Sequence, residues 1–85
     1  MRPLVIANFK MNPATPGKTE TLVRAIERGI RRLGGVETVI APPFPFLART
    51  RRLLRTSSLG AQDVAAEASG AYTGEVSARM LASIG

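Results

Sequence analysis

The 85-residue sequence contains no cysteine, no histidine and no tryptophan. Without cysteine there is no disulfide framework and no thiolate metal site, which argues against a small secreted scaffold. Without histidine, no imidazole can act as a base, an electrophile or a metal ligand. No apolar run approaches the roughly 20 residues that span a bilayer, and the N-terminus lacks a signal-peptide pattern. We therefore expect a soluble cytoplasmic protein with no membrane partner.

Acidic residues are also scarce, at 6 against 12 lysines and arginines, which gives a net charge of +6. Such an excess can indicate an anionic partner, such as nucleic acid or a phosphate ligand. The arginines fall on predicted helices, where Glu20 and Glu27 are interleaved with them, and no aromatic residues alternate with them for base stacking. We interpret the charge as a solvated helix surface and do not expect nucleic acid as a partner.

Apolar runs and turn residues predict three βα units in succession. The strands are predicted at residues 4–7, 36–41 and 58–62, and the helices at 18–33, 45–55 and 77–84. Strands that alternate with helices favour parallel pairing with right-handed crossovers, so the fold class is α/β.

Helical spacing divides the first predicted helix into two faces. The apolar face carries Leu22, Ile26, Ile30 and Leu33. The opposite face carries the i,i+4 pairs Glu20–Arg24 and Glu27–Arg31. In the second helix the expected core positions are Phe46, Leu47, Leu53 and Leu54. Ser77 is the predicted N-cap of the third helix.

Ligands of parallel α/β sheets bind at the carboxyl ends of the strands. The loops on that side are predicted at residues 8–16, 42–44 and 63–77. The first carries Lys10, one of only two lysines in the chain. The third is long for a βα loop. A lysine directly after a buried strand is either a surface turn residue or part of a ligand site.

Three stretches resemble the triosephosphate isomerase family. NFKMN at 8–12 is similar to the family's usual N-W-K-M-N, with phenylalanine in place of tryptophan. APPFPFL at 41–47 resembles the segment after the second strand, and GAQDV at 60–64 with GAYTGEVSARML at 70–81 resembles the third unit. All three come in family order and at family spacing. The resemblance implies a TIM (β/α)8-barrel, of which residues 1–85 are the first three βα units and hence an incomplete domain.

The resemblance implies an enzyme that interconverts dihydroxyacetone phosphate and glyceraldehyde 3-phosphate without a cofactor or metal. Lys10 would be catalytic, because its ammonium stabilises charge on the enediolate, and Asn8 and Lys10 would bind the phosphorylated triose. On an extended segment, alternate residues such as Asn8 and Lys10 point to the same side. Phe9 would then point the opposite way, into packing.

The long third loop would be the family's arm, which enters a neighbouring subunit of a homodimer. The resemblance places Gln62, Tyr72, Thr73, Gly74 and Glu75 at this subunit interface. Thr73 would approach the neighbour's counterparts of Asn8 and Lys10. An ordinary flexible loop would have a similar composition of small residues.

The family's histidine electrophile and glutamate base have no counterpart among these residues. We therefore predict that the 85-residue chain alone does not isomerise triose phosphates. Two alternatives remain open: a non-catalytic module that self-associates through its sheet edges, and a phosphate- or nucleic-acid-binding module driven by its arginines.

Overall fold

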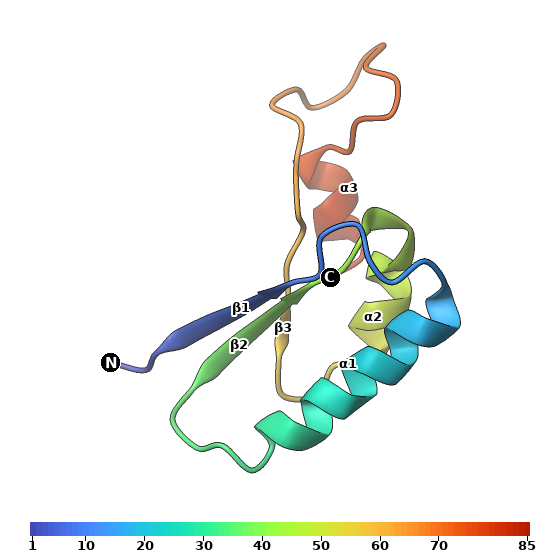
Figure 1. Ribbon diagram of the computed structural model, residues 1–85. Coiled ribbons are helices and arrows are strands. Elements are labelled where there is room, and N and C mark those ends of the chain that lie inside the picture. The colour runs from blue at the N-terminus through green and yellow to red at the C-terminus, as the bar shows by residue number, and fades with distance from the viewer.

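The computed structural model describes residues 1–85 as a three-stranded sheet with helices (Figure 1). The elements in chain order are β1 (Leu4–Asn8), α1 (Pro16–Ile30), β2 (Glu37–Ala41), the 3₁₀ turn η1 (Phe44–Phe46), α2 (Leu47–Leu53), β3 (Ser58–Leu59) and α3 (Ala78–Ser83). The strands are parallel and lie in the order β1-β2-β3. The predicted α/β class and parallel pairing are thereby confirmed.

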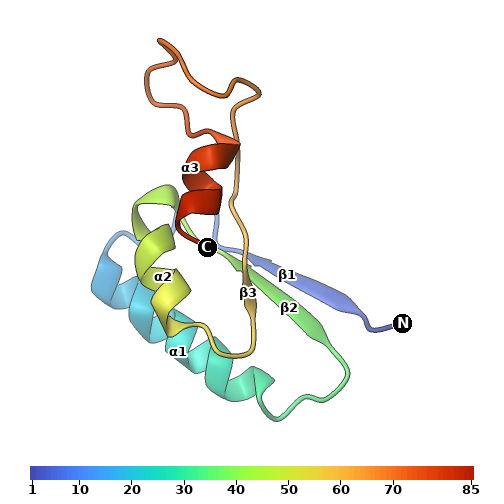
Figure 2. The ribbon, with the colours of Figure 1, turned by 180° about the vertical axis from the view of Figure 1, so that it is seen from behind.

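The core lies between the sheet and the two helices α1 and α2, which cover the same face of the sheet in both views (Figures 1 and 2). Its centre is Val23 of α1, Ile40 of β2 and Leu54, which directly follows α2. Ala7, Phe9, Ile26, Leu53 and Leu59 pack around this centre and are partly buried. Because side chains alternate along a strand, Phe9 and Ala7 share the helix-facing side, and Leu4, Ile6 and Asn8 lie on the other.

The opposite face of the sheet is bare. Leu4 and Ile6 on this face are 56% and 59% exposed, although the apolar run of β1 is typical of a buried strand. Val5, on the helix-facing side near the start of β1, is also 53% exposed. β1 and β3 each have one edge without a neighbouring strand. Apolar strands with open edges are templates for association with other strands.

Two of the four predicted inward residues of α1, Ile26 and Ile30, are confirmed, and the other two, Leu22 and Leu33, are wrong. Val23 is fully buried and Ile30 nearly so, whereas Leu22 is 40% exposed. Leu33 is 60% exposed because α1 ends at Ile30. Successive helical residues are 100° apart, so Leu22 and Val23 both border the apolar stripe, and docking against the sheet selects Val23.

Glu27 also differs from its predicted role, because it is buried and forms no ion pair with Arg31. Its carboxylate accepts the backbone N–H groups of Arg55 at 3.0 Å, Thr56 at 2.8 Å and Ser57 at 2.9 Å. Burial raises the pKa of Glu27, but the hydrogen bonds from Ser57, Thr56 and Arg55 outweigh burial and lower it overall. Glu27 thus ties α1 to the segment that connects α2 with β3.

The other predicted ion pair is present. Glu20 accepts from Arg24 at 2.8 Å and from Arg49 of α2 at 2.9 Å. Hydrogen bonds from Arg24 and Arg49 lower the pKa of Glu20. The pair with Arg49 was not predicted, because it joins residues from two helices.

Three element boundaries are corrected. α1 begins at Pro16 rather than residue 18, because the Thr15 hydroxyl caps it by accepting the Lys18 N–H at 3.2 Å. The second predicted helix is split into η1 and α2 and stops at Leu53, after which Leu54 is extended. The third strand covers only Ser58–Leu59, since β2 runs into Pro42, which has no N–H for the ladder.

The N-cap of α3 was predicted correctly. The Ser77 hydroxyl accepts the Met80 N–H at 3.2 Å, and Ser77 itself is buried. The connection from β3 to α3 projects away from the sheet as a long loop (Figure 1). Its base is closed by one backbone hydrogen bond, from Ala65 N–H to Val76 O at 2.8 Å.

Candidate functional site

Polar side chains from the first and third strand ends meet at the carboxyl edge of the sheet. Asn8 is the last residue of β1, Lys10 follows it in the turn, and Gln62 follows β3. Gln62 lies 52 positions from Lys10 in sequence yet forms a hydrogen bond with it. The parallel arrangement brings these residues together, because all three strands end at the same edge.

Lys10 adopts a left-handed backbone conformation, with a φ of 58°. The extended segment on which Asn8 and Lys10 were expected to point to the same side therefore ends before Lys10, and that expectation is wrong. The Asn8 Oδ1 accepts the Lys10 backbone N–H at 2.9 Å, which closes a local turn. A left-handed residue other than glycine costs about 1–3 kcal/mol, and such strain is concentrated at functional sites.

Gln62 holds this turn in place. Its Nε2 donates to the Lys10 carbonyl at 2.8 Å and to the Ala41 carbonyl at 2.9 Å. Ala41 O also accepts the Phe9 N–H at 3.0 Å. One amide therefore fixes the ends of β1 and β2 relative to the start of the third loop. Gln62 was predicted only as a subunit-interface residue, and this contact was not predicted. The sequence signal that could have indicated the contact is a polar residue at the end of a parallel strand.

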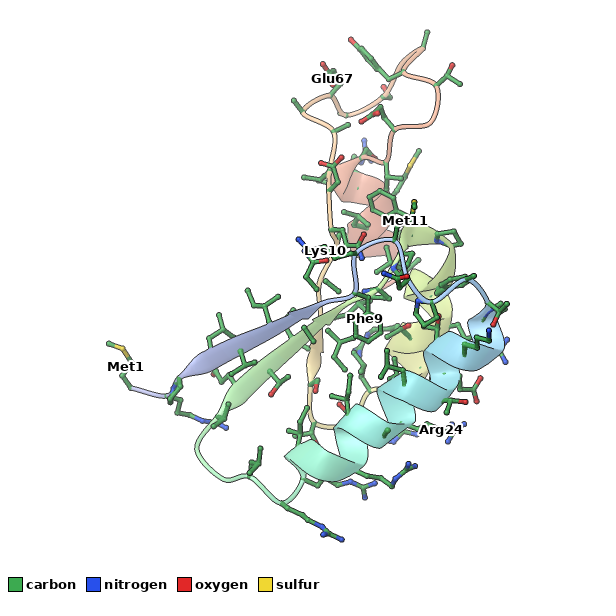
Figure 3. The ribbon with its side chains drawn as sticks, viewed as in Figure 1. Met1, Phe9, Lys10, Met11, Arg24 and Glu67 are labelled. Carbon is green, nitrogen blue, oxygen red and sulfur yellow. The ribbon has the colours of Figure 1, made fainter.

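The site presents free hydrogen-bond donors. Asn8 Oδ1 accepts the Lys10 N–H, whereas Asn8 Nδ2 forms no hydrogen bond within the chain. Lys10 is exposed and forms no ion pair. Figure 3 places Lys10 in the turn after β1, whereas Phe9 lies toward the helices. The Lys10 ammonium and the Asn8 amide are both N–H donors, and such donors are suited to bind an anionic oxygen.

The arm residues are not part of this cluster. Tyr72, Thr73, Gly74 and Glu75 are all exposed and lie in the projecting loop. Figure 3 shows the separation, with Glu67 of that loop far from Lys10. The loop turns at Tyr72, whose carbonyl accepts the Glu75 N–H at 3.0 Å, and Gly74 has a φ of 88°. Within one chain, the arm contributes nothing to the Lys10 turn.

No group of three or more His, Cys, Asp or Glu side chains in the structure could hold a metal ion. None of the helices is both long enough and apolar enough to cross a membrane.

Comparison with known proteins identifies the family. The family model described as triosephosphate isomerase matches residues 3–85, almost the whole chain. The chain belongs to the triosephosphate isomerase family.

Curated relatives agree with this assignment. The triosephosphate isomerase of Chloroflexus aurantiacus is 45% identical over 85 residues, which cover 98% of this chain and 34% of the relative. The triosephosphate isomerase of Coxiella burnetii is 48% identical over 82 residues, which cover 94% of this chain and 32% of the relative. The chain thus spans about a third of the length of the curated relatives it matches.

The fold comparison gives the same result. The crystal structure of triosephosphate isomerase from Bartonella henselae superimposes with a TM-score of 0.87 at 36% identity. The superposition covers 100% of this chain and 35% of that chain. The predicted family is confirmed, and the parallel βα units correspond to part of the TIM fold.

Proposed function

We propose that residues 1–85 supply the first three βα units of a triosephosphate isomerase barrel, with Lys10 as its catalytic lysine. The reaction would be the interconversion of dihydroxyacetone phosphate and glyceraldehyde 3-phosphate, in glycolysis and gluconeogenesis in the cytoplasm. The observation that supports this most directly is the strained turn at Lys10, which Asn8 and Gln62 hold from both sides. No cofactor is required in this proposal.

In this reaction Lys10 and Asn8 would act as electrostatic and positioning groups. Removing a proton next to the substrate carbonyl leaves negative charge on oxygen, and a fixed ammonium stabilises that charge as it develops. The Asn8 Nδ2 group would donate to the same substrate and orient it beside Lys10. The family's glutamate base and histidine electrophile have no counterpart among these residues, so the 85-residue chain is expected to be inactive by itself.

The arm would act between subunits. Tyr72, Thr73, Gly74 and Glu75 project from the fold and are exposed, which is the condition for insertion into a second copy. We propose that this arm and the region of Gln62 form the interface of a homodimer, with Thr73 near the partner's lysine site.

A hybrid barrel tests the catalytic proposal. Residues 1–85 replace the matching third of the Chloroflexus aurantiacus enzyme, and isomerase turnover is measured with purified protein. We expect activity in the hybrid and a fall of roughly 100- to 1,000-fold on Lys10→Ala, the usual effect of removing one electrostatic donor. Lys18→Ala is the matched control, because Lys18 is the only other lysine and lies on α1.

Equal turnover of the Lys10→Ala and Lys18→Ala hybrids would refute the role of Lys10. Turnover by the isolated 85-residue chain, abolished by Lys10→Ala, would refute its predicted inactivity.

A non-catalytic self-associating module is the second candidate. The bare apolar face of β1 and the unpaired edges of β1 and β3 favour it. Sedimentation of the isolated chain as a defined oligomer, together with an inactive hybrid barrel, would support this candidate over the first.

A further inference from the structure

Five arginines surround one cleft at the end of α1 and α2. The cleft measures about 460 Å³ and is lined by Arg24 and Arg28 of α1, by Arg31 directly after α1, by Arg52 of α2 and by Arg55 after α2, together with Glu27 and Leu53. Figure 3 shows the position of one lining residue, Arg24, on α1. Small-molecule sites have volumes of this order, roughly 300–1,000 Å³.

Carboxylates neutralise only part of the positive charge in the cleft. Arg24 pairs with Glu20, but Arg28, Arg31, Arg52 and Arg55 form no ion pair. Glu27 is the only acidic residue in the lining. Both of its oxygens are already occupied by the backbone N–H groups of the segment after α2.

The dipoles of α1 and α2 offset only part of the positive charge of this arginine cluster. Arginines near a helix C-terminus are favourable, because that end carries roughly half a negative charge. Two helix ends therefore offset about one unit of charge. Arg24 is already paired with Glu20, so the other four guanidinium groups and the Glu27 carboxylate leave three positive charges in the lining. An excess of about two units remains.

We propose that this cleft binds a chain of linked phosphates, either an inorganic oligophosphate or the phosphate tail of a nucleoside triphosphate. One guanidinium group can bind two phosphate oxygens at once through two parallel N–H bonds. Several guanidinium groups from the α1 and α2 regions line this cleft. The lining contains no aromatic residue on which a base could stack. The cleft is bounded by residues of α1 and α2, which favours a compact anion over an extended nucleic acid.

Calorimetric titration of the 85-residue chain with inorganic triphosphate at low ionic strength tests the proposal. The cleft variant is Arg28→Gln with Arg52→Gln. The matched control is Arg32→Gln with Arg51→Gln, which removes the same charge from the same end of the helices, but at arginines outside the cleft lining. We expect at least about tenfold weaker binding in the cleft variant, because two guanidinium groups that can each bind phosphate oxygens through two N–H donors are removed. The control should change roughly twofold, through screened long-range charge.

Two further measurements complete the test. Bound triphosphate should raise the thermal midpoint of the parent and the control but not of the cleft variant. The variant Arg28→Lys with Arg52→Lys keeps the positive charge but loses the two-donor guanidinium groups, so several-fold weaker triphosphate binding is expected. Circular dichroism checks that every variant has the parent's helix content.

Equal loss in the cleft variant and the control would overturn the proposal, as would the absence of triphosphate binding or tighter binding to a DNA duplex. Equal binding of inorganic and nucleoside triphosphate would support it and assign recognition to the phosphates alone. Tighter binding of the nucleoside triphosphate, lost in the cleft variant, would also support it and identify the nucleotide as the source.

Discussion

The Glu27 carboxylate accepts hydrogen bonds from three consecutive backbone N–H groups through its two oxygens. Replacing it by an amide removes one of these two oxygens. Oε2 accepts from Arg55 and Thr56, and Oε1 accepts from Ser57. In Glu27→Gln, the carbonyl oxygen can keep the first two bonds without their charge. The NH₂ group then faces the Ser57 N–H, so two donors oppose each other.

The expected loss follows from these contacts. Hydrogen bonds to charged groups contribute about 1.5–3 kcal/mol each, and an orphaned buried donor costs about 1–3 kcal/mol. Because Glu27 is only 5% exposed, water cannot readily replace the lost acceptor. We expect Glu27→Gln to lower the free energy of unfolding by about 2–3 kcal/mol at neutral pH, and Glu27→Ala to lower it further.

The effect depends on pH in a defined direction. The pKa of Glu27 lies below its ordinary value of 4.5 in the folded chain. A carboxyl with a lowered folded pKa stabilises the fold above its unfolded pKa, and this stabilisation is lost as the pH falls through the folded pKa. The difference between parent and Glu27→Gln should therefore be largest near neutral pH and should narrow below about pH 4.5.

Urea unfolding followed by far-ultraviolet circular dichroism measures the loss. Amide hydrogen exchange at Arg55, Thr56 and Ser57 provides a local readout that does not require a complete unfolding curve. Glu20→Gln is the control, since Glu20 is a partly exposed carboxylate on the same helix whose partners, Arg24 and Arg49, are exposed, and it should show a much smaller loss. A loss below about 0.5 kcal/mol in Glu27→Gln, the range of ordinary surface substitutions, would refute the reasoning, as would a loss independent of pH.

Three other substitutions have expected outcomes. Thr50 is fully buried and its hydroxyl has no hydrogen-bond partner, so Thr50→Val should raise the free energy of unfolding by about 1 kcal/mol; a decrease in urea unfolding would contradict this. A Cβ on Gly60 would lie 2.7 Å from Val39 Cγ1, so Gly60→Ala should cost about 1–3 kcal/mol, and adding Val39→Ala should recover part of it. In the hybrid barrel, Gln62→Leu should lower turnover about tenfold or more, because it frees the Lys10 turn; unchanged turnover would show that Gln62 does not position Lys10.

Local sequence signals predicted the order of the elements and one of the two side-chain N-caps. Ser77 was identified as an N-cap because serine before an apolar run satisfies the first helix N–H groups. Thr15 was missed because the prolines and glycine beside it read as a loop, although Pro16 is favourable in a first helical turn. Both signals are short-range, so the correct information was present in the sequence in each case.

The candidate site was only partly accessible from the sequence. The position of Lys10 after the first strand and the family motif both follow from residues 8–12. Its left-handed conformation does not, because lysine has no intrinsic preference for that region. The turn is held by Gln62, a residue 52 positions away, and only the parallel packing of the strands brings the two together.

The sequence by itself determined the alternation of strands and helices, the parallel sheet and the lysine at its carboxyl edge, because periodicity and turn residues act over a few positions. Only the tertiary structure decided that Val23 rather than Leu22 faces inward and that Glu27 binds backbone N–H groups instead of Arg31. The physical reason is that both choices are close in local energy. Docking α1 against the sheet and α2 determines which side chains lose their water and must find partners within the protein.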